Sequence, residues 1–74
     1  MSTAMPRPSI RAHVVDSASC ALGIVHCADP DVPWLILRMP GSGHTWSVPV
    51  TGVRPATREE SIDIARLDGD SWAM

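Results

Sequence analysis

The chain has 74 residues and a mass of 8.0 kDa, a length that fits one small domain and excludes a multidomain enzyme, a Rossmann unit or a TIM barrel. Hydrophobic residues make up 45% of the chain and charged residues 19%, which is typical of folded rather than disordered proteins. Six arginines, no lysine and eight acidic residues give a net charge of −2, which disfavours nucleic-acid and anionic-membrane partners because both favour a basic surface.

The first nine residues contain two prolines and no periodic apolar pattern, so we expect residues 1–9 to form a mobile N-terminal arm. They lack the apolar stretch of a secretory signal, and the longest apolar run, 32–37, is too short to cross a bilayer. We therefore expect a cytoplasmic protein with no membrane partner. Cys20 and Cys27 fit that compartment as free thiols, since an extended chain would hold their Cα atoms about 23 Å apart and a disulfide needs less than about 7 Å.

Alternating apolar residues predict a strand over 10–16 and a second strand over 22–27, joined by a small polar turn over 17–20. In the register we favour, the numbers of facing residues add to 39, which places His13 opposite His26. Two imidazoles so close cannot both become charged without a cost, so His13 and His26 form a candidate pH-sensitive pair. A register shifted by one residue would separate them, and two independent exposed histidines are the alternative. Gly23 indicates a bulge or a close approach of another part of the chain.

The next segments predict a second hairpin and a final short strand. Trp34–Arg38 forms the first strand, residues 39–44 a glycine-rich turn, and residues 45–48 a half-buried strand in which Trp46 faces inward. Residues 49–52 form a short turn, and the strand over 53–54 stops at Pro55. We therefore expect five antiparallel strands.

A helix follows the predicted strands. Thr57 and Glu60 have the spacing of a capping box, in which each side chain binds the backbone of the other residue. We expect the helix to run from about residue 58 to about residue 67 and to end at Gly69, with a loose tail over 70–74. A helix this short must dock on the sheet to be stable.

Five short strands with hairpin connections favour a small antiparallel barrel. The order of Trp34–Arg38, the glycine-rich tip and residues 46–53 resembles the distal hairpin, fourth strand, 3₁₀ turn and fifth strand of SH3-like barrels. Residues 21–25 are similar to the glycine-centred strand of KOW-type barrels, and 14–60 resembles short proteins from GC-rich genomes. The resemblance implies a mainly β fold, with an SH3-like barrel over 10–56 and a C-terminal helix and tail over 57–74.

One face of the predicted sheet offers a candidate partner-binding site. If Leu35 and Leu37 face the core, strand alternation sends Trp34, Ile36 and Arg38 to the opposite face. These three residues then lie under the C-terminal helix, against Ile62 and Ala65, or they form an exposed site for a partner. We favour the helix cover, because an exposed tryptophan–isoleucine patch promotes aggregation.

The chain shows no pattern for catalysis, a metal or a cofactor. Gly41–Ser42–Gly43 lacks the strand-to-helix setting of a nucleophile elbow, and the potential zinc ligands lack the usual spacing. These ligands are His13, Cys20, His26, Cys27 and His44. We therefore expect a non-catalytic protein-interaction or regulatory module with an unidentified protein partner. The alternative is a small-barrel nucleic-acid-binding protein, which a cluster of Arg11, Arg38 and Arg54 on one face would favour.

Overall fold

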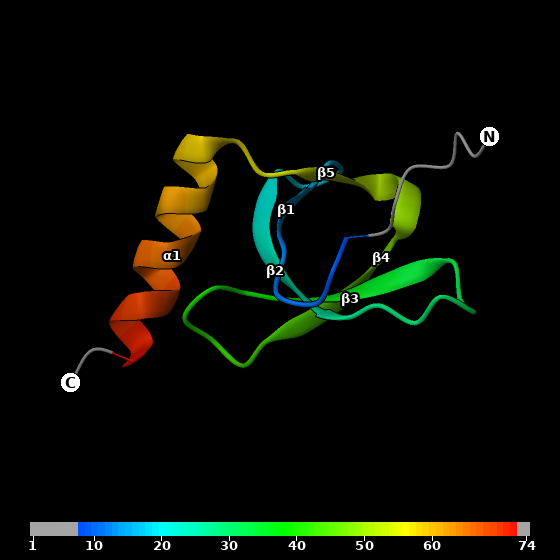
Figure 1. Cartoon of the computed structure of the whole chain (residues 1–74), viewed down its shortest axis with the longest axis horizontal. Coiled ribbons are helices and arrows are strands. Elements are labelled where there is room, and N and C mark those ends of the chain that lie inside the picture. The colour runs from blue at the N-terminus through cyan, green and yellow to red at the C-terminus, as the bar shows by residue number, and fades with distance from the viewer. Residues whose placement is uncertain (1–7, 73–74) are drawn as a thin grey trace.

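The computed structural model describes residues 8–72, in which five strands precede one long helix. The elements are β1 (His13–Asp16), β2 (Ala21–Cys27), β3 (Trp34–Arg38), β4 (Thr45–Pro49), the 3₁₀ helix η1 (Val50–Gly52), β5 (Val53–Pro55) and α1 (Arg58–Trp72). All paired strands are antiparallel, in the sheet order β4-β3-β2-β1-β5 (Figure 1). The mainly β class, with five strands and a C-terminal helix, is confirmed. Within residues 8–72 no ladder joins β4 to β5, so the sheet is not closed. Most of the expected N-terminal arm lies outside the described residues.

The sheet curls around an apolar core built from alternate strand residues. Its central cluster is Val14, Val25, Leu35, Leu37 and Val48, each at most 5% exposed. The predicted inward orientation of the alternating residues on β3 and β4 is thus confirmed, and Trp46 packs against the same cluster while partly buried. A Cβ on Gly23 would lie 3.1 Å from Leu37 Cδ1 and 3.3 Å from Trp46 Cη2. Gly23 therefore marks a close approach of the side chains of Leu37 and Trp46, one of the two alternatives expected from the sequence. The bulge-like irregularity in β2 lies between Val25 and Cys27 and not at Gly23.

The register predicted for the first hairpin is wrong. His13 pairs with Ile24, so the numbers of facing residues add to 37 and not to 39. The turn does occupy residues 17–20, and a turn centred on Ala18 and Ser19 requires this sum. His26 is exposed at the irregular step of β2, so the proposed histidine pair does not form. The first strand is also shorter than predicted and begins at His13.

The helix begins as predicted and ends later. The backbone N–H of Glu60 donates to Thr57 Oγ1 at 3.1 Å, and that of Thr57 donates to Glu60 Oε1 at 2.8 Å, which confirms the capping box. The helix then continues through Gly69 to Trp72, so the predicted stop at Gly69 is wrong and residues 70–72 belong to the helix. From Pro8 to Trp72, no helix combines the length and apolar character needed to span a membrane.

Candidate functional site

A row of four side chains crosses the outer face of the sheet. His13 pairs with Ile24, Ile24 with Arg38, and Arg38 with Thr45. Residues directly opposite each other in antiparallel strands lie on the same face, so these four form one row from β1 to β4. α1 packs against β1 and β2, which carry the first half of this row (Figure 1).

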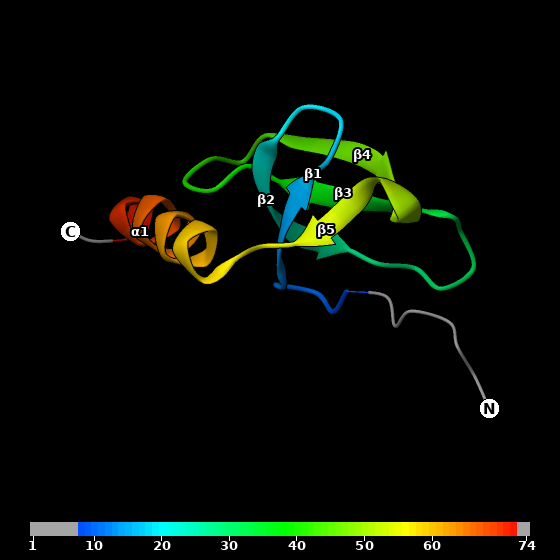
Figure 2. The same cartoon turned by 90° about the horizontal axis from the view of Figure 1, so that it is seen from above.

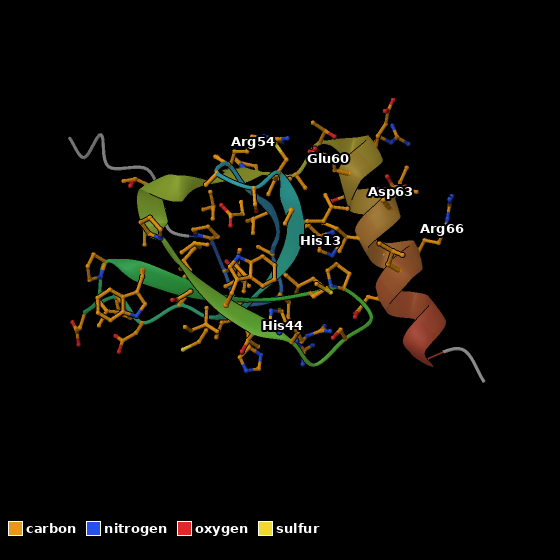
Figure 3. All side chains as sticks on the ribbon, turned by 180° about the vertical axis from the view of Figure 1, so that it is seen from behind. His13, His44, Arg54, Glu60, Asp63 and Arg66 are labelled. Carbon is orange, nitrogen blue, oxygen red and sulfur yellow. The ribbon has the colours of Figure 1, made fainter. Side chains whose placement is uncertain are left out.

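Side chains of α1 bind this row at several points. Ser61 Oγ lies 2.9 Å from His13 Nδ1, and Figure 3 shows His13 directed toward the helix. Arg38 donates two hydrogen bonds, of 2.9 and 3.3 Å, to the Asp68 carboxylate, and the N–H of Gly41 donates to the same carboxylate at 3.1 Å. Ile64 is fully buried between these polar contacts. Within residues 58–69, the helix is thus held by the buried side chain of Ile64 and by hydrogen bonds on either side of it.

A second ion pair holds the beginning of α1. Arg54 on β5 donates two hydrogen bonds, of 2.7 and 2.8 Å, to the Glu60 carboxylate (Figure 3). The bonds from Arg54, and then the one from the Thr57 N–H, lower the pKa of Glu60 to about 2, and the bonds to Glu60 raise the pKa of Arg54. At the other end of the helix, the bonds from Arg38 and then from the Gly41 N–H lower the pKa of Asp68. Both carboxylates therefore stay ionised at neutral pH and hold the helix through charge-assisted bonds.

The remainder of the outer face is not covered by the helix. Cys27 pairs with Ile36 and Ile36 with Ser47, while Trp34 pairs with Pro49. We call these five residues the Trp34 strip. Trp34 is 48% exposed, Ile36 is half-buried, and the other three are exposed. In Figures 1 and 2, α1 and the β2–β3 loop, which leads into Trp34, lie at opposite ends of the molecule.

A shallow groove of about 600 Å³ opens beside the strip. It is lined by Pro33, Trp34, Ser47, Val48, Pro49, Val50 and Thr51. None of these residues is charged, and most of the lining is apolar. The nearest charged loop positions in the chain are Asp29 and Asp31, both exposed. The groove therefore suits an apolar segment that stacks on the Trp34 indole.

The residues proposed from the sequence divide into two groups. The register confirms that Trp34, Ile36 and Arg38 share the face opposite to the core. Arg38 lies against the helix and binds Asp68, but Trp34 is open, so the expected cover of Trp34 by α1 is wrong. The physical reason is the orientation of α1: over residues 58–69, Glu60, Ser61, Ile64 and Asp68 face the sheet. Ile62 and Ala65, which we expected in that contact, are exposed.

The docking face of the helix was not predicted, although the chain carries a signal for it. Residues 60, 61, 64 and 68 follow the spacing of one helical face, but only position 64 is apolar. Polar side chains at the other positions bind sheet residues that are 6 to 48 positions away in sequence. Hydrophobic periodicity alone does not detect such a face.

A second groove, of about 740 Å³, lies between residues 8–14 and β5. His13 and Arg54 contribute its main ionisable groups, and each already binds α1, through Ser61 and Glu60 respectively. Because these two ionisable groups already bind the helix, they are not available to bind a ligand in the groove.

The remaining candidate ligands and cations are spread over the fold. Cys20 and Cys27 are free and exposed, and among the side chains described for residues 8–69 no cluster of three or more histidine, cysteine or acidic groups could hold a metal ion. Of the three arginines that a nucleic-acid surface would share, Arg38 and Arg54 are engaged in ion pairs and Arg11 is exposed.

No protein-family model, curated protein or solved structure matches the chain. The function must therefore be inferred from the chemistry of the Trp34 strip and its surroundings.

Proposed function

We propose that the protein is a non-catalytic protein-interaction module and that the Trp34 strip is its binding site. The observation that carries the proposal is the exposed Trp34 indole at the rim of an uncharged, mainly apolar groove. Tryptophan is enriched at protein interfaces, and a large side chain in a pocket often supplies much of the binding energy. The strip lies on the part of the outer face that α1 leaves open.

The proposed partner is a protein segment with an apolar side chain that packs on Trp34 and Pro49. Arg38, which the sequence placed in the same site, is assigned instead to holding the helix, because its guanidinium binds Asp68 and its side chain is only 26% exposed. Kinship with SH3-like barrels is part of the proposal and is supported by η1, which follows β4 at the position where the resemblance places a 3₁₀ turn. The free thiols of Cys20 and Cys27 support a cytoplasmic location.

Binding of nucleic acid is the competing hypothesis. Phosphate contacts need cations that are available to the ligand. Arg38 and Arg54 face carboxylates at 2.9 and 2.7 Å, and the net charge of the chain is −2. These observations favour a protein partner, and the experiment below includes nucleic acid as an outcome that would contradict the proposal.

The proposal is tested by comparing three baits in capture from host lysate, with mass spectrometry and a nucleic-acid assay as the readouts. The baits are the wild type, Trp34→Ala, and the control Ile62→Ala, which truncates an apolar side chain of matching exposure, 49% against 48%, on α1. A protein retained by the wild type and the control, but lost with Trp34→Ala, is then purified and titrated by calorimetry.

We expect Trp34→Ala to raise the dissociation constant of that protein by about tenfold or more, which is the effect of losing an interface tryptophan worth at least about 1.4 kcal/mol. Equal binding to all three variants would contradict the proposal. Recovery of nucleic acid in place of a protein would favour the competing hypothesis.

A further inference from the structure

The outer edge of β4 carries unpaired backbone groups. Hydrogen bonds from Met39 N to His44 O and from Val50 N to Pro33 O flank the β3–β4 ladder at its two ends. Hydrogen-bonded and non-hydrogen-bonded pairs alternate along an antiparallel ladder. Counting inward from the flanking bonds, the N–H and C=O groups of Trp46 and Val48 are the ones directed toward β3. The backbone groups directed away from the sheet belong to Thr45, Ser47 and Pro49. All three residues are exposed.

The two edges of the sheet differ in how they are protected. On β5, the same alternation directs Val53 and Pro55 outward, so that this short edge offers one N–H donor. On β4, five residues without charge or bulge offer the N–H groups of Thr45 and Ser47. Proteins usually protect an exposed edge with charges, prolines or bulges, because an open edge recruits another strand. On β4 only the proline at the end of the strand does so.

We propose that β4 pairs antiparallel with β4 of a second copy of this chain, about a twofold axis at Ser47. In this register the two Ser47 residues exchange N–H···O=C bonds, and each Thr45 N–H faces the Pro49 carbonyl of the other copy, which also accepts the first hydrogen bond of η1. The pattern is self-complementary at its centre, where each Ser47 presents one N–H and one C=O to the other copy, whereas Pro49 has no N–H to offer the facing Thr45 carbonyl. No charged side chain of β4 faces a like charge across the axis.

The proposed pairing places the outer faces of the two copies on the same side of one continuous sheet. Ser47 and Pro49 belong both to the pairing edge and to the Trp34 strip, so the two strips become neighbours. A dimer would then present two binding sites on one surface, which increases avidity for a partner with two matching segments. The pairing itself does not depend on the function proposed for the strip.

Sedimentation velocity of the full chain, from about 1 μM to about 1 mM, tests the pairing. We expect a monomer–dimer equilibrium that Ser47→Lys weakens about fivefold or more, because it places two like charges directly opposite each other at the axis. Ala65→Lys adds the same charge at an exposed position of α1 and should leave the equilibrium unchanged. Trp34→Ala should also remain dimeric, which separates this test from that of the partner site.

Amide hydrogen exchange provides a second measurement that needs no variant. We expect the amides of Thr45 and Ser47 to become protected as the wild-type concentration rises, while the Val53 amide at the other edge does not change. A chain that stays monomeric at every concentration, a Ser47→Lys variant as dimeric as the wild type, or exchange at Thr45 and Ser47 that is independent of concentration would overturn the proposal.

Discussion

The two halves of the outer sheet face differ in whether the helix covers them, although both contain side chains of β3. At one end, Arg38 and Ile24 lie against α1, and residues 58–69 of the helix contribute one buried side chain, Ile64, among several hydrogen bonds. At the other end, Trp34 and Pro49 have no cover from the helix. The buried side chain of Ile64 contributes the larger share of the docking energy, and the hydrogen bonds on either side of it fix which end of the face the helix covers. The larger apolar side chain, Trp34, stays open to solvent.

The largest effect should come from removing the apolar contact of the covered half. Ile64→Ala deletes most of a fully buried side chain and should reduce the free energy of unfolding by about 2–5 kcal/mol, with loss of helical circular dichroism. Ile62→Ala truncates a side chain on another face of the helix that is 49% exposed, and it should change the free energy of unfolding by less than about 0.5 kcal/mol. Equal effects of the two substitutions in urea unfolding would mean that Ile64 does not anchor the helix.

Removal of the ion pair at the far end of the helix should have a smaller effect. Arg38→Ala breaks the bonds to Asp68, whose side chain is 22% exposed, and should cost about 1 kcal/mol. A double-mutant cycle with Asp68→Ala isolates the coupling between the two side chains. Arg66→Ala, at an exposed position of the same helix, is the control. A coupling energy near zero would remove the ion pair from the account of helix docking.

The stability of the covered half should also depend on pH. The pKa of Glu60 falls from 4.5 to about 2 on folding, so the unfolded chain binds a proton more readily than the folded chain does. The stabilisation is therefore fully present above about pH 4.5 and is lost as the pH falls toward 2, and the lowered pKa of Asp68 acts in the same direction. Thermal melts should show a smaller loss between these pH values for Glu60→Gln than for the wild type. The control is Glu59→Gln, at an exposed neighbour, and an equal loss in all three proteins would contradict the assignment.

Local signals predicted the strands and the start of the helix well. The alternating residues of Trp34–Arg38 define β3 to the residue, and the capping box at Thr57 and Glu60 marks the start of α1. Each signal depends on neighbours within a few residues, so no tertiary information is needed. Alternation also placed Trp34 and Arg38 on one face.

The failures concern relations between distant segments. The histidine pair required the register of β1 against β2, which the turn sets and which places Ile24 opposite His13. The end of the helix was placed at Gly69 by local preference, whereas Asp68 binds Arg38 and Gly41, 30 and 27 positions away. Which half of the face is covered depends on these long-range bonds, and so the openness of Trp34 could not be predicted.

The smallest effect on stability should come from the open half. Trp34→Ala removes a side chain that is 48% exposed and should change the unfolding midpoint far less than Ile64→Ala does. Urea unfolding measures both variants on the same scale. If Trp34→Ala destabilised the protein as much as Ile64→Ala, Trp34 would belong to the core and not to a binding surface.

Fluorine NMR of the chain labelled with 5-fluorotryptophan tests most directly whether Trp34 is an open binding residue. The Trp34 resonance is assigned with Trp34→Phe, and a paramagnetic additive in the solvent measures how accessible each indole is. We predict that the additive broadens the Trp34 resonance much more than that of Trp46, whose indole N–H binds Asp16, and that the captured partner removes this broadening at Trp34 alone. A Trp34 resonance that is shielded in the isolated chain, or still broadened when the partner is bound, would contradict the account.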